Sequence, residues 1–78
     1  MKARFVYNGQ IIAGGNIEVV PEEGIYVEVQ ETDKVYMVTA VMFKVLLNGE
    51  TGIFVYLGDT SPHIERFLKN YQKTEETK

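Results

Sequence analysis

Residues 35–47 read Val-Tyr-Met-Val-Thr-Ala-Val-Met-Phe-Lys-Val-Leu-Leu, an apolar stretch interrupted by Thr39 and Lys44. β-Branched and aromatic residues of this kind favour a β-strand, although thirteen residues exceed the usual strand length. A one-residue bulge near Thr39-Ala40 would place both halves of the stretch on one face, because it resets the alternation of side chains. A long strand bent in this way helps a sheet to curl into a small barrel. The residues that we expect to point inward are Tyr36, Val38, Val41, Phe43 and Val45.

Turn signals divide the rest of the chain into further strands. Asn8-Gly9 and Asn48-Gly49 are hairpin dipeptides, in which both central residues need a positive φ. Pro21–Gly24 and Glu31–Lys34 are two further turns. Gly14-Gly15 predicts a bulge or a sharp bend within a strand. The expected strands cover residues 2–7, 10–20, 25–30, 35–47 and 53–58.

These features predict a mostly β fold (β+α). We expect a five-stranded antiparallel meander curled into a small SH3-like or OB-like barrel, with one C-terminal α-helix. Closure of the barrel would remove unpaired strand edges. The alternative architecture is an open antiparallel sheet that is covered on one side.

The pattern after the last strand predicts a helix over 62–72. Ser61 is a suitable N-cap and Pro62 suits the first helical position. An apolar stripe follows at helical spacing, and so short a helix must bury this stripe to be stable in water. The helix therefore either covers one open end of the barrel or docks on a neighbouring subunit. The stripe comprises Ile64, Phe67, Leu68 and Tyr71.

Length and composition limit the functional classes. The chain of 78 residues is enough for one domain, which we place at 1–72, followed by a disordered polar tail at 73–78. It contains no cysteine and a single histidine, so we expect no disulfide and no metal site. A core this small gains stability from a second subunit, which predicts a homo-oligomer.

The net charge and the hydropathy of the chain predict where the protein is located and which partners it does not bind. The net charge of −3 opposes binding to nucleic acid, and the candidates for a local basic patch outside the helix are Lys2, Arg4 and Lys44, apart from Lys34 in a loop. No apolar run reaches the length of a membrane span, and Asn8-Gly9 interrupts the N-terminal segment too early for a signal peptide. We expect a cytoplasmic protein without a membrane association.

Residues that often carry catalysis have simpler explanations here. His63 would lie in the first turn of the helix, where the nearby Asp59 and Ser61 serve the turn and the cap. Glu22 and Glu23 are adjacent and point in opposite directions in an extended chain. Gly14-Gly15-Asn16 could bind an anion, but no P-loop sequence follows it. We therefore expect no catalytic, cofactor-binding or metal-binding residue and no enzymatic activity.

Aromatic and methionine side chains form the candidate binding surface. They fall on the strand faces opposite the expected core and exceed what solubility requires. They would seat the C-terminal helix, form a subunit or partner interface, or stack against nucleic-acid bases. With three basic residues they would also suit a small anionic ligand such as a nucleotide. The candidate binding residues are Tyr26, Met37, Met42, Phe54, Tyr56, Arg4, Lys44 and Arg66.

A resemblance adds to this interpretation. Pro21-Glu22-Glu23-Gly24-Ile25-Tyr26-Val27-Glu28-Val29, followed by Val35-Tyr36-Met37-Val38-Thr39-Ala40-Val41, resembles a pattern of small uncharacterised phage and prophage proteins. Phe5–Gly9 is similar as well, so the resemblance covers roughly residues 4–57. It implies a phage accessory protein with an SH3-like barrel. It assigns no catalytic residues and does not include the helix.

The sequence therefore predicts a small non-enzymatic interaction protein that self-associates and engages a host protein. The first alternative is a protein that binds or sequesters a small ligand such as a nucleotide. The second is a module that binds single-stranded nucleic acid.

Overall fold

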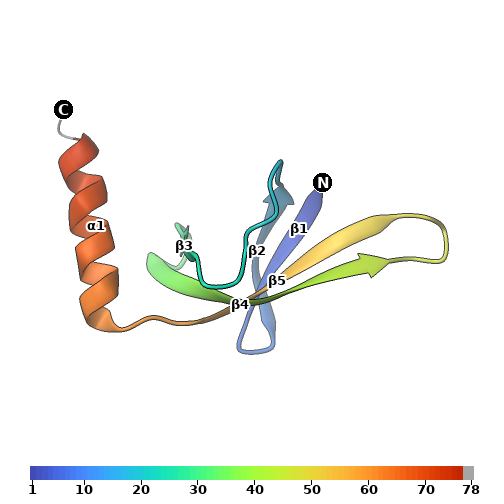
Figure 1. Cartoon of the computed structure of the whole chain (residues 1–78), viewed down its shortest axis with the longest axis horizontal. Helices are drawn as coiled ribbons and strands as arrows, with labels where there is room; N and C mark the ends of the chain where they lie inside the picture. Colours follow the sequence, from blue (N-terminus) through green and yellow to red (C-terminus); the bar gives the residue numbers. More distant parts are fainter. Residues whose placement is uncertain (77–78) are drawn as a thin grey trace.

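The fold is mostly β, with one sheet and one helix (Figure 1). The computed structural model describes residues 1–76, and it describes side chains for residues 1–70. The sheet has the strand order β2-β1-β5-β4-β3. The elements are β1 (Lys2–Tyr7), β2 (Gln10–Asn16), β3 (Tyr26–Val29), β4 (Lys34–Val45), β5 (Thr51–Asp59) and α1 (Pro62–Glu76).

The sheet is mixed, so the expected antiparallel meander is wrong. The hairpins β1–β2, β3–β4 and β4–β5 are antiparallel, but β1 and β5 run parallel. The reason lies in β2, which ends at Asn16 rather than at residue 20. Residues 17–25 then form a connection to the far edge of the sheet, where β3 begins. The inner edge of β1 is therefore free to pair with β5.

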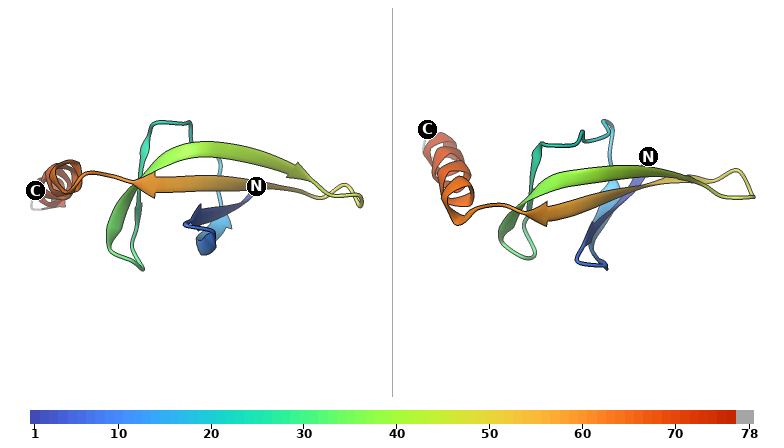
Figure 2. Two further views of the ribbon diagram at one scale, coloured as in Figure 1. Left: turned by 90° about the horizontal axis from the view of Figure 1, so that it is seen from below. Right: turned by 60° about the horizontal axis from the view of Figure 1, so that its bottom comes forward.

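The sheet curls into a half-barrel that stays open, which corrects the expected closed barrel (Figure 2). Strands β2 and β3 form its two edges, and they do not pair with each other in the described residues. The molecule measures 46 × 27 × 20 Å, with a radius of gyration of 14.0 Å. A compact chain of this length has a radius of gyration of about 11.5 Å. The difference arises because the β4–β5 hairpin extends beyond β1 at one end of the molecule. At the other end, α1 projects away from the sheet (Figure 1).

The two Asn-Gly dipeptides form different turns. Asn8 and Gly9 have φ values of 53° and 80°, as expected for a two-residue hairpin. At the second dipeptide only Gly49 has a positive φ, of 87°, so the expectation for Asn48 is wrong. The amide of Gly49 donates to the carbonyl of Leu46 at 3.0 Å, which gives a three-residue loop closed by a glycine.

The bulge expected in the long strand is confirmed at Thr39. Val38 pairs with Leu57 and Ala40 pairs with Tyr56, so Thr39 has no partner residue on β5. Its hydroxyl donates instead to the carbonyl of Tyr56 at 3.1 Å. The bulge therefore keeps inward-pointing side chains on one face on both sides of this position.

The bulge expected at Gly14-Gly15 is wrong. These two glycines pair regularly with Arg4 and Ala3. The register shift in this hairpin falls at Ile12, between the paired residues Ile11 and Ala13. A β-carbon added at Gly14 would lie 3.3 Å from the carbonyl oxygen of Ala3, so a close backbone approach explains the glycine better than a bend.

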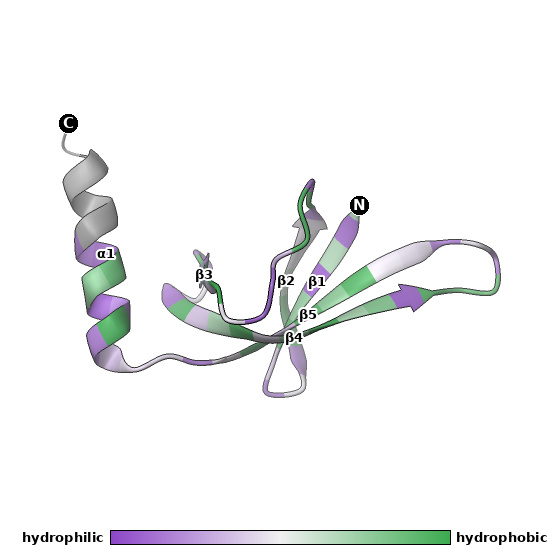
Figure 3. Ribbon diagram, viewed as in Figure 1, coloured by the Kyte–Doolittle hydropathy of each residue, from purple (hydrophilic) through white to green (hydrophobic). Residues whose placement is uncertain are grey.

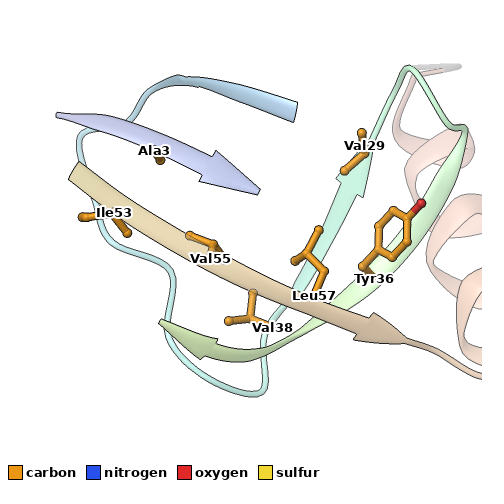
Figure 4. Close-up of a cluster of buried hydrophobic side chains, with 7 residues drawn as sticks. All are labelled: Ala3, Val29, Tyr36, Val38, Ile53, Val55 and Leu57. Atoms are coloured by element: carbon orange, nitrogen blue, oxygen red, sulfur yellow. The ribbon is translucent and has the colours of Figure 1, made fainter. Parts of the chain in front are cut away.

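The buried core lies on one side of the half-barrel, which we call the inner face. It combines side chains from all strands except β2 (Figure 4). Val38 and Val55 have no exposed surface, and Ile53 is 1% exposed. The opposite side of the sheet is the outer face. The core residues are Ala3, Val29, Tyr36, Val38, Ile53, Val55 and Leu57.

Two tyrosines join the two halves of the inner face. The ring of Tyr7 on β1 packs on the ring of Tyr36 on β4, with centroids 4.9 Å apart. The hydroxyl of Tyr7 donates to Oδ1 of Asp59 at 2.5 Å, and the hydroxyl of Tyr36 donates to Oγ1 of Thr32 at 3.0 Å. The hydrogen bond to Asp59, followed by desolvation, raises the pKa of Tyr7.

This shift predicts a loss of stability at alkaline pH. The folded state holds the Tyr7 proton more tightly than the unfolded state. Its contribution is therefore complete below the ordinary tyrosine pKa of about 10 and is lost as the pH rises through the higher pKa of the folded state. We expect urea unfolding to show a smaller alkaline decline for Tyr7→Phe than for the wild type. An equal decline in both proteins would contradict this role.

Helix α1 attaches to the sheet at the start of β4. Val35 pairs with Glu28 on β3, but β5 ends before it can pair with Val35 on the other side. Side chains bond to the backbone of Val35 there instead. Oε2 of Glu65 accepts from the amide of Val35 at 2.8 Å, and the hydroxyl of Thr60 donates to its carbonyl at 3.1 Å. Nζ of Lys69 donates to the carbonyl of Asp33 at 2.6 Å. Val35 is 6% exposed and lies outside the core cluster.

The helix does not close the half-barrel, so its expected role as a cover is wrong. It lies beyond the β3–β4 turn and leaves the inner face open (Figure 2). Phe67 of its apolar stripe is 65% exposed. The helix continues to Glu76, so the expected tail at 73–78 begins inside it, and residues 77–78 lie outside the described residues. No helix in residues 1–76 is long and apolar enough to cross a membrane.

Replacing Glu65 with alanine tests this attachment. The variant loses a charge-assisted hydrogen bond, and we expect about 1 kcal/mol lower unfolding free energy. Hydrogen exchange at the amide of Val35 should accelerate, since that amide loses its acceptor. The exposed neighbour Arg66→Ala is the matched control. Equal exchange of the Val35 amide in both variants would show that the helix is not held in this way.

Candidate functional site

The outer face brings together most of the candidate binding residues. Arg4, Phe54 and Met42 form one cross-strand row over β1, β5 and β4. Tyr26 and Met37 are paired on β3 and β4. Helix α1 projects from the end of the sheet and does not lie over β1 and β5, so it is not seated on the part of this face that these two strands form (Figure 1). The candidates on the outer face are Tyr26, Met37, Met42, Phe54, Tyr56, Arg4 and Lys44, whereas Arg66 lies apart on α1.

A basic cleft lies at one end of this face. We define it by Lys2, Arg4, Lys44, Phe54 and Gly52. The guanidinium carbon of Arg4 lies 5.9 Å from the centroid of the Phe54 ring, and Nζ of Lys44 lies 5.4 Å from it. Both distances allow a cation–π interaction. The Phe54 ring therefore attracts the side chains of Arg4 and Lys44, but it is uncharged and leaves their positive charges uncompensated.

The electrostatics of the cleft contrast with the rest of the molecule. The net charge of the chain is −3, yet none of the three cleft cations forms an ion pair with another residue in the described part of the chain. Glu50 is the acidic residue in the cleft lining. Acidic residues collect instead around the β2–β3 connection, β3 and the following turn. They are Glu18, Glu22, Glu23, Glu28, Glu31 and Asp33.

A second feature is the distal part of the β4–β5 hairpin, residues 43–53, which we call the arm. Beyond the Phe43–Ile53 pair it has no pairing with β1, and its β4 side remains largely hydrophobic (Figure 3). Phe43 and Val45 share the inner face with Ile53, but they are 55% and 67% exposed. Leu47 at the tip is fully exposed. The sequence therefore predicts the face of Phe43 and Val45 correctly but not their burial, because the described residues supply no layer to cover the arm.

A third feature is an apolar groove on the inner face, lined by β1, β3 and the β2–β3 connection. The β2–β3 connection forms one wall, with Val19 80% exposed and Val20 38% exposed. Phe5 and Val27 form the floor from β1 and β3. The groove has a volume of about 440 Å³, and Glu22 is the charged residue in its lining. The sequence did not indicate this groove, because the pattern of residues 17–20 predicted a continuing strand, whereas β2 ends at Asn16.

Two of the residues near the start of the helix that were considered for catalysis, Ser61 and Asp59, make structural hydrogen bonds. Oγ of Ser61 accepts from the amide of Ile64 at 3.2 Å, so it caps the helix as expected. Asp59 accepts from Tyr7, and His63 is exposed on the first helical turn. In residues 1–70, no group of three His, Cys, Asp or Glu side chains is placed to hold a metal ion.

The fold and its surfaces define a small half-barrel protein with a protruding β arm, an apolar groove and a basic cleft. Comparison with known proteins finds no matching family model, no curated protein of similar sequence and no matching solved structure.

Proposed function

We propose that this protein is a non-enzymatic binding protein that self-associates, with the arm of one copy seated in the groove of a second copy. The observation that carries the proposal is the exposure of Phe43, Val45 and Leu47 on a protruding hairpin. Soluble monomers rarely expose a contiguous apolar patch of several hundred Å² without using it. Covering these side chains gains about 25 cal/mol for each Å² of apolar surface buried.

The groove supports a second copy as the occupant. The exposed arm residues Phe43 and Val45 and the groove lie on the same inner face, and we infer a two-fold axis between two copies that brings each arm onto the other groove. The contact between arm and groove would then occur twice in the dimer, which moves the buried area toward the roughly 1,600 Å² typical of stable interfaces.

Charge limits what the groove accepts. Glu22 lines the groove, and Glu18 and Glu23 flank its wall. This acidic wall disfavours nucleic acid as the occupant of the groove.

The proposed function retains a host protein as a second partner, as the resemblance to phage accessory proteins implies. Self-association through the inner face leaves α1 and the outer face available for such a partner. Phe67, at 65% exposure, is the most exposed apolar side chain on the described part of α1.

Sedimentation equilibrium over a wide range of protein concentration tests the proposal. We expect a dimer, or a larger closed assembly of this chain, at micromolar concentration. Small-angle scattering should then give a larger radius of gyration than the 14.0 Å of one chain. A monomer that persists at hundreds of micromolar would overturn the proposal.

A further inference from the structure

The basic cleft on the outer face is not used by the proposed self-association, which involves the inner face. Lys2 and Arg4 reach it from β1, and Lys44 reaches it from β4. These strands are separated by β5, whose Phe54 lies between Arg4 and Lys44. Three like charges held close together without an ion pair in residues 1–70 require a compensating anion or solvent.

Gly52 leaves room in the cleft for a ligand. It pairs with Lys44 and lies two residues before Phe54, so its side-chain position also faces outward. A β-carbon built on it would meet nothing within 4 Å. Its φ is not in the left-handed region, so the backbone does not require glycine there. The glycine therefore keeps the cleft open rather than permitting a turn.

We propose that the basic cleft binds the phosphate group of a small phosphate monoester. Lys2, Arg4 and Lys44 carry three positive charges and Glu50 carries one negative charge, which leaves a net charge of +2 in the cleft lining to match a dianion. Arg4 can donate two parallel hydrogen bonds to phosphate oxygens. The cleft volume of about 160 Å³ suits a compact phosphate group better than a stacked base. Arg4 and Lys44 already lie over the Phe54 ring, so a nucleic-acid base that stacked on this ring would have to displace one of them.

The expected consequence is saturable binding of inorganic phosphate and of phenyl phosphate. Two-dimensional amide NMR at constant ionic strength, balanced with chloride, should show shifts centred on Lys44, Gly52 and Phe54. Affinity for phenyl phosphate should increase as the pH rises through about 6, where a phosphate monoester gains its second charge. Oligothymidylate serves as the competing probe, because it carries phosphodiesters rather than a monoester.

Matched variants separate the cleft from general electrostatics. Gly52→Val fills the open position and suits a strand, so the fold should persist while phosphate affinity falls by about tenfold or more. Lys44→Met should have a similar effect. Lys34→Met removes the same charge at the far end of β4 and should change the affinity less than about twofold.

Three outcomes would overturn the proposal. The first is an absence of saturable shifts with both phosphate probes. The second is equal binding by the wild type and a folded Gly52→Val variant. The third is binding of oligothymidylate without binding of inorganic phosphate or phenyl phosphate, which would assign the cleft to a nucleic-acid backbone.

Discussion

Replacing Phe43 with serine is expected to raise the dissociation constant of self-association by about 100-fold, or about 2.8 kcal/mol. Phe43 lies on the inner face of the arm and is 55% exposed in one chain. In the proposed dimer its ring enters the groove of the partner, where a large aromatic side chain loses most of its contact with water. Large aromatic anchors at the centre of an interface typically dominate binding energy.

Met42→Ser is the matched control for this prediction. Met42 is the preceding residue on β4, is 44% exposed and points to the outer face with Phe54. Its loss of apolar surface is comparable, but we expect the dissociation constant to change less than about threefold. Sedimentation equilibrium measures both variants. An equal effect of Phe43→Ser and Met42→Ser would contradict the assignment of the inner face as the interface.

Replacing Ile53 with alanine is expected to lower the free energy of unfolding by about 2–5 kcal/mol. Ile53 is 1% exposed and packs where β1 meets the base of the arm, beside Ala3. A small domain has only a few kcal/mol to lose, so this variant should be largely unfolded near physiological temperature. Urea unfolding followed by circular dichroism, at a concentration below dimer formation, measures the effect.

Leu47→Ala is the control for the core. Leu47 is fully exposed at the tip of the arm, so we expect a change below about 0.5 kcal/mol in the same experiment. If Leu47→Ala destabilised the single chain as much as Ile53→Ala, the arm would have to be covered by its own chain. The half-barrel would then not be open in the manner described.

Local signals predicted the strands because each depends on residues close in sequence. The pattern around Thr39 gave the bulge and the inward face of β4, and Asn8-Gly9 gave the first hairpin. The pairing of β1 with β5 joins residues about fifty positions apart, and no local pattern encodes it. The parallel arrangement depends on where residues 17–25 travel, which the turn residues alone do not determine.

Two expectations failed for related reasons. Gly14-Gly15 indicated a bend, but a glycine also allows a close backbone approach, and the sequence does not distinguish the two. The stripe containing Ile64 and Phe67 correctly indicated a helix but not what it contacts. Its attachment comes from polar side chains on the backbone of Val35, which amphipathic spacing does not reveal.

The sequence indicated which basic residues were candidates for the site, but it did not indicate that the fold brings them together. Lys2, Arg4 and Lys44 were the basic candidates outside the helix, apart from Lys34 in an expected turn, and the sheet brings them together. Their convergence on Phe54 depends on the β1–β5 pairing. Gly52 carried no visible signal, since an isolated glycine near a strand end fits many roles.

Site-specific cross-linking tests the central claim most directly, because the chain contains no native cysteine. Val45→Cys on the arm and Val19→Cys on the groove wall are made as separate variants, mixed and treated with a short bismaleimide. We predict efficient cross-links between these two variants, and few between Val45→Cys and Gln10→Cys at the exposed start of β2. Cross-linking to Val19→Cys no stronger than to Gln10→Cys would contradict the seating of the arm in a second copy.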